Sequence, residues 1–297
     1  MSDQPSPADG PAELRAFLRS RRARITPEQA GVPAGPGPRR VPGLRREEVA
    51  ALAGVSTDYY VRLERGRNPH VSTAVLDAVA RALRLDETER EHLAALARPR
   101  PARTRPLPVQ KLAPGLGQVL DSVRDLPAMV TGRRQDILAT NHLMRALYLD
   151  FDALPSRERN MARYVFLNPH ARSLYADWEH AARGVVASLH LYAGRHPDDP
   201  RLAELIGELS LRNEDFRRWW AAHEVLRHAH GTKRYHHPVV GDLTLHYQAL
   251  TPAADGEQVL GLYTAEPGSA SDEALRLLAS WAAPSPATDA PARRAGD

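Results

Sequence analysis

The sequence of 297 residues contains no cysteine and no apolar run long enough to cross a membrane. Without cysteine, disulfides, thiolate zinc sites, iron–sulfur clusters and cysteine nucleophiles are all excluded. The first ten residues, MSDQPSPADG, also lack the apolar stretch of a secretory signal. We therefore expect a soluble protein of the cytoplasm, and the 42% of hydrophobic residues is typical of a globular fold.

Lysine is scarce as well, because arginine provides 38 of the 40 basic residues. The charge is unevenly distributed along the chain. Residues 1–106 carry 19 Arg and 13 acidic residues, a net charge of +6, whereas residues 107–297 carry 21 basic and 23 acidic residues, a net charge of −2. This asymmetry predicts an anionic partner for the N-terminal part. The arginine bias alone has a second explanation, since it also accompanies GC-rich coding.

Segments rich in proline divide the chain. Residues 98–108, RPRPARTRPLP, are typical of a semi-rigid basic linker, and residues 31–43, GVPAGPGPRRVPG, indicate a long loop. The predicted organisation is a disordered tail (1–10), an all-helical domain (11–98), a Pro/Arg-rich linker (99–112), a second domain (113–283) and a second disordered tail (284–297).

The N-terminal domain is expected to contain five short helices. Its apolar residues recur at helical spacing in five separate segments. Ser56 and Ser72 precede two of these segments as N-caps, and Asp86 with Glu89 forms a capping box before the last one. This domain is therefore predicted to be entirely α-helical.

The C-terminal domain has a different pattern. Short apolar runs at 128–131 and 137–140 flank a turn, as in a β-hairpin, and residues 243–249 alternate as a half-buried strand does. Another strand is expected at 259–265, a closing helix at 273–281, and several helices in between. Such an order predicts an α+β fold, with an antiparallel sheet covered on one side by helices.

The stretch RREEVAALAGVSTDYYVRLER, residues 45–65, meets the demands of a helix-turn-helix unit. Ala50 is small where the second helix must cross the first, Gly54 tolerates a left-handed turn, and Val55 fills the corner. The exposed first half of the second helix is the part that enters the major groove. Its outward residues would be Thr57, Asp58, Tyr59 and Arg62.

The string GLRREEVAALAGVSTDYYVRLERGR resembles the helix-turn-helix of the Xre/lambda-repressor-like family, and the similarity continues through residues 71–97. The resemblance implies that this domain binds double-stranded DNA with the helix after Ser56 as recognition helix. The residues that it places at the DNA are Arg46 beside the phosphate backbone, Ser56, Thr57 and Asp58 at the start of the recognition helix, Arg62 toward base edges, and Arg65, Arg67 and Asn68 on phosphates.

The chemistry of these residues agrees with such roles. Arg62 offers a bidentate donor pair for guanine, worth about 1–3 kcal/mol of discrimination. Asp58 either accepts from cytosine or holds Arg62 at i,i+4, and we favour the second because a carboxylate near phosphates is costly unless it is paired. Tyr59 either contacts the DNA backbone or packs partly in the core. Glu64 resembles the family's buried acidic residue and is expected to orient the unit.

Three C-terminal segments resemble a second family, the MmyB-like ligand-binding domain. They are NEDFRRWWAAHEVLRH (213–228), HHPVVGDLTLHYQAL (236–250) and QVLGLYTAEPGS (258–269). The resemblance implies a PAS-like fold with an apolar cavity, and a fatty acid or similar apolar molecule as the ligand. No other cofactor is expected.

Five histidines between residues 223 and 237 suggest a metal site. The run HEVLRH begins like a zinc-protease helix, but Arg227 stands where the second ligand is required, and His228 is rotated about 100° away from that position. Zinc hydrolysis is therefore excluded by the spacing. We interpret His228 and His230 as residues at a helix end, where the helix dipole favours them.

On a single helix, Trp219, His223 and Arg227 would form one stripe. We predict that His223 and Arg227 hold the carboxylate head of an apolar ligand. The alternative is an ordinary core, because aromatic stripes at helical spacing usually pack. The residues predicted to line the body of the ligand are Met129, Tyr164, Trp219, Leu245 and Tyr263.

Together these features predict a sequence-specific transcription regulator whose C-terminal domain senses a small apolar ligand. One recognition helix reads too few base pairs for useful specificity, so we expect a homodimer on a pseudo-palindromic operator. No complete catalytic constellation is found in the sequence, and we do not expect an enzyme. The alternative is a DNA-binding protein whose second domain only dimerises or docks a protein partner.

Overall fold

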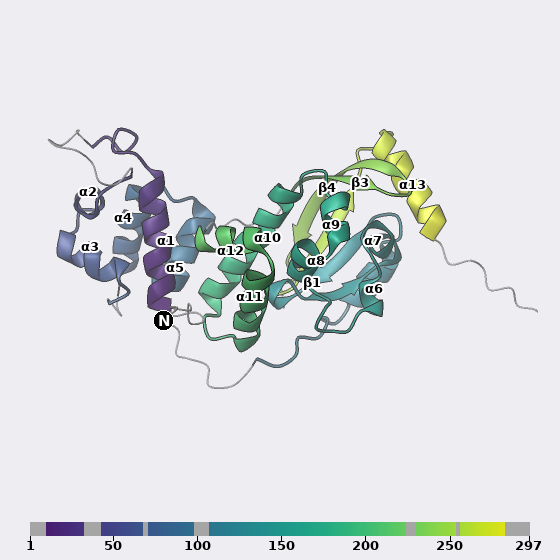
Figure 1. The fold of residues 1–297 in the computed structure, drawn as a ribbon, viewed down its shortest axis with the longest axis horizontal. Coiled ribbons are helices and arrows are strands. Elements are labelled where there is room, and N and C mark those ends of the chain that lie inside the picture. The colour runs from purple at the N-terminus through teal and green to yellow at the C-terminus, as the bar shows by residue number, and fades with distance from the viewer. Residues whose placement is uncertain are drawn as a thin grey trace, which may run out of the picture.

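The computed structural model describes residues 10–32, 43–67, 71–97, 107–223, 230–253 and 256–282. Three kinds of segment lie largely outside the described residues. They are the two expected tails (except Gly10), most of the loop at 31–43, and most of the expected linker. Of the expected site residues, Asn68 and Arg227 also lie outside them. The described parts form a small helical domain at one end of an elongated molecule and a larger domain with a sheet at the other end (Figure 1).

The N-terminal domain consists of five helices within the described ranges, as predicted. They are α1 (Gly10–Arg24), α2 (Arg46–Leu52), α3 (Thr57–Glu64), α4 (Thr73–Ala82) and α5 (Glu87–Ala97). The side chains of Ser56 and Ser72 accept from the backbone N–H three residues later, so both predicted N-caps are confirmed. Asp86 and Glu89 accept from each other's backbone N–H, which confirms the capping box.

The C-terminal domain contains a five-stranded antiparallel sheet. Its strands are β1 (Ala128–Thr131), β2 (Ile137–Thr140), β3 (His230–His237), β4 (Gly241–Leu250) and β5 (Val259–Thr264), in the spatial order β2-β1-β5-β4-β3. The predicted hairpin and the two predicted C-terminal strands are confirmed. β3 was not predicted. His230 begins this strand, so its interpretation as a helix-end residue is wrong.

Helices share one hydrophobic core with one face of the sheet. They are α7 (His142–Leu147), α8 (Met161–Leu167), α9 (Pro169–Leu174), α10 (Trp178–Arg195), α11 (Pro200–Arg212), α12 (Glu214–Ala221) and α13 (Ala270–Ala282), with short 3₁₀ turns at Arg133–Gln135 and Phe151–Ala153. Because side chains alternate along β1, Met129 joins the core under these helices, whereas Ala128 and Val130 face the other side. There they pack with Leu120 of α6 (Leu116–Ser122).

The expected stripe of Trp219, His223 and Arg227 on one helix does not form. α12 ends at Ala221, and the backbone of His223 has a φ of 53°, in the left-handed region that terminates a helix. His223 therefore no longer lies four residues along the same helical face as Trp219, which is buried in the core.

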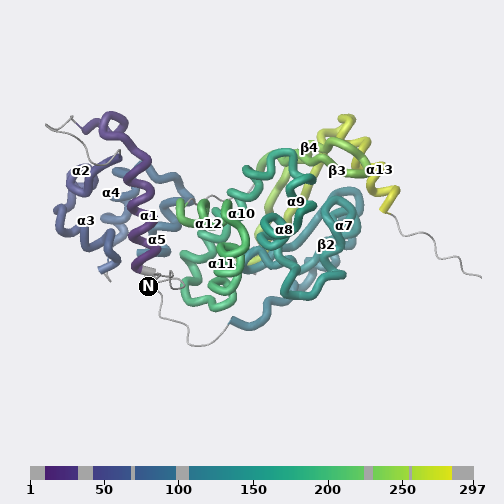
Figure 2. The backbone as a smooth tube through the Cα atoms, viewed as in Figure 1, coloured from purple at the N-terminus to yellow at the C-terminus, as the bar shows by residue number. Residues whose placement is uncertain are grey.

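The two domains pack against each other through α10. Leu191 of α10 belongs to the hydrophobic core of the N-terminal domain, and the guanidinium of Arg195 lies 3.5 Å from the carboxylate of Glu91 on α5. Gly194 lets the two helices approach, because a Cβ there would lie 2.6 Å from the ring of His92. Figure 2 shows α10, α11 and α12 between the N-terminal helices and the sheet.

Candidate DNA-binding and ligand-binding sites

The corner between α2 and α3 has the geometry that its sequence demands. Ala50 is 1% exposed at the contact between the two helices. Gly54 has a φ of 65°, and the N–H of Val55 donates to the carbonyl of Ala50 at 3.0 Å, which ends α2 in a left-handed C-cap. The turn therefore fixes the direction in which α3 leaves.

α3 presents a polar face to solvent. Ser56, Thr57, Asp58 and Arg62 are exposed and Tyr59 is half-buried, whereas Tyr60 and Leu63 of the same helix are buried in the core. α2 and α3 lie at the end of the molecule farthest from the sheet, so the second domain does not cover this face (Figure 1). The residues predicted to read base edges are therefore accessible to a DNA duplex.

A buried carboxylate joins the two ends of the helix-turn-helix unit. Glu64, the last residue of α3, is 1% exposed and accepts two hydrogen bonds from the guanidinium of Arg46, the first residue of α2. The two N···O distances are 3.1 and 3.0 Å, and these bonds raise the pKa of the Arg46 guanidinium. Arg46 is 42% exposed, so it still reaches the surface where phosphates would lie.

Other predicted DNA contacts surround the C-terminal end of α3. Arg65 and Arg67 are both exposed just after the helix. Within the described residues no ion pair joins Asp58 to Arg62, so the favoured i,i+4 pairing does not form. The carboxylate of Asp58 is thus an accessible acceptor near the helix N-terminus, whose dipole stabilises it.

The C-terminal domain contains a cavity of about 780 Å³ between α10 and the sheet. Small residues open it on both sides. On the sheet they are Gly231, Ala249 and Gly261, and on α10 they are Ala181, Gly184 and Ser188, which recur on one helical face. Its volume falls in the range of about 300–1,000 Å³ that is typical of small-molecule sites.

Lys233 of β3 lines this cavity and has an unusual environment. Its ammonium lies 4.3 Å from the ring centre of Tyr247 and donates to the hydroxyl of Tyr263 at 3.3 Å. No carboxylate in the described part of the chain forms an ion pair with it. Burial lowers the pKa of Lys233, because desolvation disfavours the charged ammonium. The group is therefore suited to an anion that enters from outside.

Several charged residues elsewhere on the cavity wall are already paired. The guanidinium of Arg134 binds the carboxylates of Asp199 at 2.6 Å and Asp136 at 2.7 Å. Glu257 accepts from Arg133 at 2.6 Å and lies 2.6 Å from the ring of His196. In these pairs each charge is balanced by its partner, whereas the ammonium of Lys233 has no such partner in the ranges that the structure describes.

The structure separates the residues that were predicted to bind the ligand. Met129 and Tyr263 line the cavity. Tyr164, Trp219 and Leu245 are buried in the main core instead. His223 does not line the cavity and faces the N-terminal domain, where its ring lies 3.2 Å from Glu13. The sequence did not predict Lys233 as a ligand-binding residue. It is one of only two lysines, and it points to the same face of β3 as the buried Tyr235, two residues along the strand.

Two family models match the chain in the order of its domains. Residues 112–278, more than half of the chain, match the MmyB-like transcription regulator ligand binding domain. The chain belongs to this family. Residues 13–93 match a helix-turn-helix domain, which includes α1 to α5 almost completely. A comparison with curated proteins found no match.

The two matches identify this MmyB-like protein as a DNA-binding transcription regulator with a ligand-binding domain, as its sequence predicts. Neither matched family is a family of enzymes. None of the helices in the described ranges is both long and apolar enough to span a membrane.

Proposed function

We propose that this MmyB-like regulator binds a pseudo-palindromic operator as a homodimer and senses a small apolar ligand with an anionic head group, such as a fatty acid. The observation that carries the proposal is the double role of α10. One face of this helix lines the cavity, and the same helix packs on the N-terminal domain through Leu191 and Arg195. A ligand that displaces α10 therefore acts on the N-terminal domain, and so on the placement of α3, through α5 and the core that Leu191 enters.

The cavity supports this class of ligand. Met129, Val185 and Leu189 supply apolar wall, and Tyr247 and Tyr263 stand beside Lys233. A hydrocarbon chain gains about 25 cal/mol per Å² of apolar surface removed from water. A carboxylate at Lys233 would form a charge-assisted hydrogen bond in a partly desolvated place. The ammonium of Lys233 thus takes the head-group role that was first expected of His223.

The small size of the recognition surface supports a dimer. A single α3 reaches only a few base pairs, whereas two copies related by a two-fold axis read half-sites about one helical turn apart. α13 exposes Leu277 and Trp281, one turn apart, as apolar surface for a second copy. Native mass spectrometry with an operator selected from random duplexes should show two chains per duplex, and one chain per duplex would contradict the dimer.

The proposed ligand is tested by extracting bound lipids from the purified protein with organic solvent and identifying them by mass spectrometry. Ser188→Leu places a larger side chain in the cavity, whereas Ser173→Leu makes the same change on the exposed surface of α9. We expect a fatty acid in the wild-type protein and in Ser173→Leu, and a loss from Ser188→Leu. An equal lipid content in all three would show that the cavity is not the site. It would favour the alternative of a domain that only dimerises or docks a protein.

A ligand that regulates DNA binding must bind two arrangements of the protein with different affinity. DNA affinity should therefore be measured by fluorescence anisotropy with delipidated protein, before and after hexadecanoate is added. A change in the dissociation constant supports the proposal, whatever its direction. Identical affinities with a filled cavity would contradict regulation through α10.

A further inference from the structure

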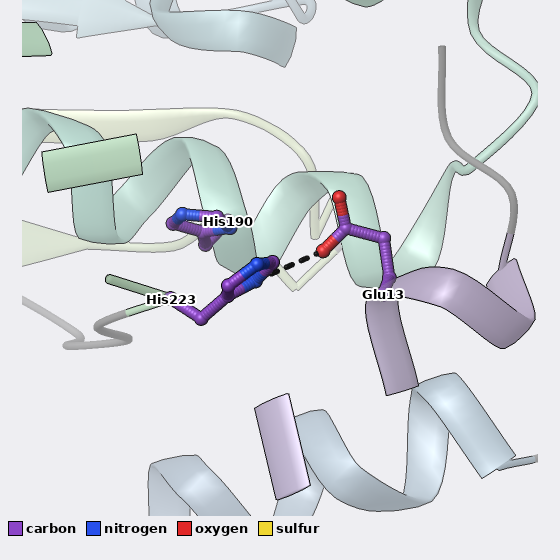
Figure 3. A group of neighbouring side chains, drawn as sticks. All are labelled: Glu13, His190 and His223. Atoms are coloured by element: carbon purple, nitrogen blue, oxygen red, sulfur yellow. Dashed lines mark ion pairs between the residues drawn. The ribbon is translucent and has the colours of Figure 1, made fainter. Parts of the chain in front are cut away.

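Three side chains from separate elements meet where the two domains touch. Glu13 lies on α1 of the N-terminal domain, His190 on α10, and His223 just after α12. One ligand atom from each residue lies within 4.8 Å of the others. Figure 3 shows the ring of His223 between the ring of His190 and the carboxylate of Glu13. The role predicted for His223 from helical spacing, at the head group of the ligand, leaves this cluster unexplained.

His190 is held with one ring nitrogen free to act as a ligand. It is 0% exposed, and its Nε2 lies 3.0 Å from the carbonyl oxygen of Trp220, which can only accept a hydrogen bond. Nε2 therefore carries the proton, and Nδ1 of the neutral ring has a lone pair. Nδ1 is buried without a hydrogen-bond partner among the described residues. This arrangement matches metal-binding histidines, whose second nitrogen usually donates to a carbonyl or carboxylate.

His223 is positioned by the opposite domain. Its carbonyl accepts a hydrogen bond of 2.6 Å from the guanidinium of Arg21 on α1, and its backbone is left-handed. Its Nδ1 lies 3.2 Å from Oε2 of Glu13, yet it is buried and does not make an aligned hydrogen bond. Two ligand atoms on one tetrahedral zinc ion, with bonds of about 2.0–2.1 Å, are about 3.3 Å apart. The oxygen and the nitrogen already have that separation.

The charged groups around the cluster are compatible with a bound cation. The carboxylate of Glu13 is 17% exposed and lies 3.2 Å from the ring of His223. The guanidinium of Arg21, which donates to the carbonyl of His223, is paired with Glu89 at 3.0 Å. The donor set is therefore one carboxylate oxygen and two imidazole nitrogens.

We propose that Glu13, His190 and His223 form a site for a divalent late first-row transition metal ion, Zn²⁺ in the first place, that bridges the two domains. Two imidazoles and one carboxylate are a donor set that such ions prefer, with further positions available to water. The inference does not depend on the proposed ligand or operator. Because the ligands come from both domains, a bound ion fixes α1 to α10 and stabilises their contact.

The test uses full-length protein without a histidine tag, freed of metal with a chelator. Co²⁺ serves as a spectroscopic probe, and Zn²⁺ competes with it for the same site. Glu13→Gln keeps the shape of the side chain, and His223→Asn keeps a residue that tolerates the left-handed backbone. The control is His236→Asn, which removes a histidine that lies 2.6 Å from Asp242 on the exposed surface.

We expect one equivalent of Co²⁺ to bind the wild type and His236→Asn with visible d–d absorption bands, and one equivalent of Zn²⁺ to displace it. Glu13→Gln and His223→Asn should each weaken the affinity by about tenfold or more. Zn²⁺ should also raise the thermal midpoint of the wild type but not that of these variants, whose folding without metal is checked by circular dichroism. Absent stoichiometric binding, or an undiminished affinity in folded Glu13→Gln and His223→Asn, would overturn the site.

Discussion

The guanidinium of Arg46 donates two hydrogen bonds to the buried carboxylate of Glu64, so the first residue of α2 is tied to the last residue of α3. Arg22 of α1 adds a second cation at 3.6 Å from the same carboxylate. The angle of the recognition helix thus depends on a charged contact as well as on the corner at Gly54. Both features can be tested by substitution.

Glu64→Gln should reduce the free energy of unfolding by about 2 kcal/mol, because it removes hydrogen bonds to a charged group and leaves a buried amide less well paired. The control is Glu47→Gln, whose carboxylate is 63% exposed and lies 3.6 Å from Arg45. That exposed pair should contribute at most about 0.5 kcal/mol. Urea unfolding measures both variants, and equal losses would contradict a special role of Glu64.

Gly54→Ala should cost about 1 kcal/mol of stability, because alanine must adopt a φ of 65° there. Nothing lies within 4 Å of the added Cβ, so the loss is conformational rather than steric. Gly54→Asn should cost less, since asparagine tolerates this region. Gly207→Ala, at an open position within α11, should instead stabilise by about 0.5–1 kcal/mol. A stabilising Gly54→Ala would refute the argument.

The helix-turn-helix could be predicted from the sequence because its signals are local. The N-caps Ser56 and Ser72 accept hydrogen bonds from N–H groups three residues away. Gly54 takes the left-handed conformation that lets the N–H of Val55 reach the carbonyl of Ala50, five residues earlier. The hairpin of β1 and β2 is likewise set by a short turn between two apolar runs. Family resemblance then identified the ligand-binding domain, whose match spans residues 112–278.

The cavity and the cluster at the domain interface could not be predicted in the same way. β3 has exposed, polar and histidine-rich positions, and it becomes a strand through pairing with β4. Lys233 gains its role from Tyr263, thirty residues away on a third strand. His223 looked like part of a continuous helix, but its carbonyl bonds to Arg21, about 200 residues earlier in the chain. Such contacts depend on tertiary packing, which periodicity does not encode.

Arg62→Ala and Arg67→Ala should weaken DNA binding in different ways. Arg62 is exposed on the outward face of α3, so its loss should cost about 1–3 kcal/mol at the selected operator and little on random DNA. Arg67 follows the helix, and its loss should weaken all sequences and reduce the salt slope by about one unit. Anisotropy titrations at several salt concentrations separate the two effects. Equal losses on random DNA would contradict these roles.

Lys233→Met should lower the affinity for hexadecanoate by about tenfold or more, because a charge-assisted hydrogen bond contributes about 1.5–3 kcal/mol. The affinity for the neutral methyl ester should change little, since methionine retains the apolar contacts. The other lysine of the chain, the exposed Lys111, provides the matched control Lys111→Met. If acid and ester lose affinity equally in Lys233→Met, the ammonium does not bind the head group.

Stability should fall as the pH rises above about 10, because three tyrosines are buried as a hydrogen-bonded group. The hydroxyl of Tyr148 lies 2.8 Å from that of Tyr235 and accepts from that of Tyr175 at 2.9 Å. Burial raises the pKa of all three hydroxyls well above the ordinary value of about 10. The native state therefore keeps protons that the unfolded chain releases above this pH.

The free energy of unfolding then declines with pH, by about 1.4 kcal/mol per pH unit for each such tyrosine, whereas the contribution is fully present below pH 10. Urea unfolding between pH 8 and 11 measures the slope. Tyr148→Phe should already be less stable at pH 8, since it removes the hydroxyl that joins the other two, and its slope should be smaller by about one proton. An unchanged stability up to pH 11 in the wild type would show that these hydroxyls ionise without unfolding.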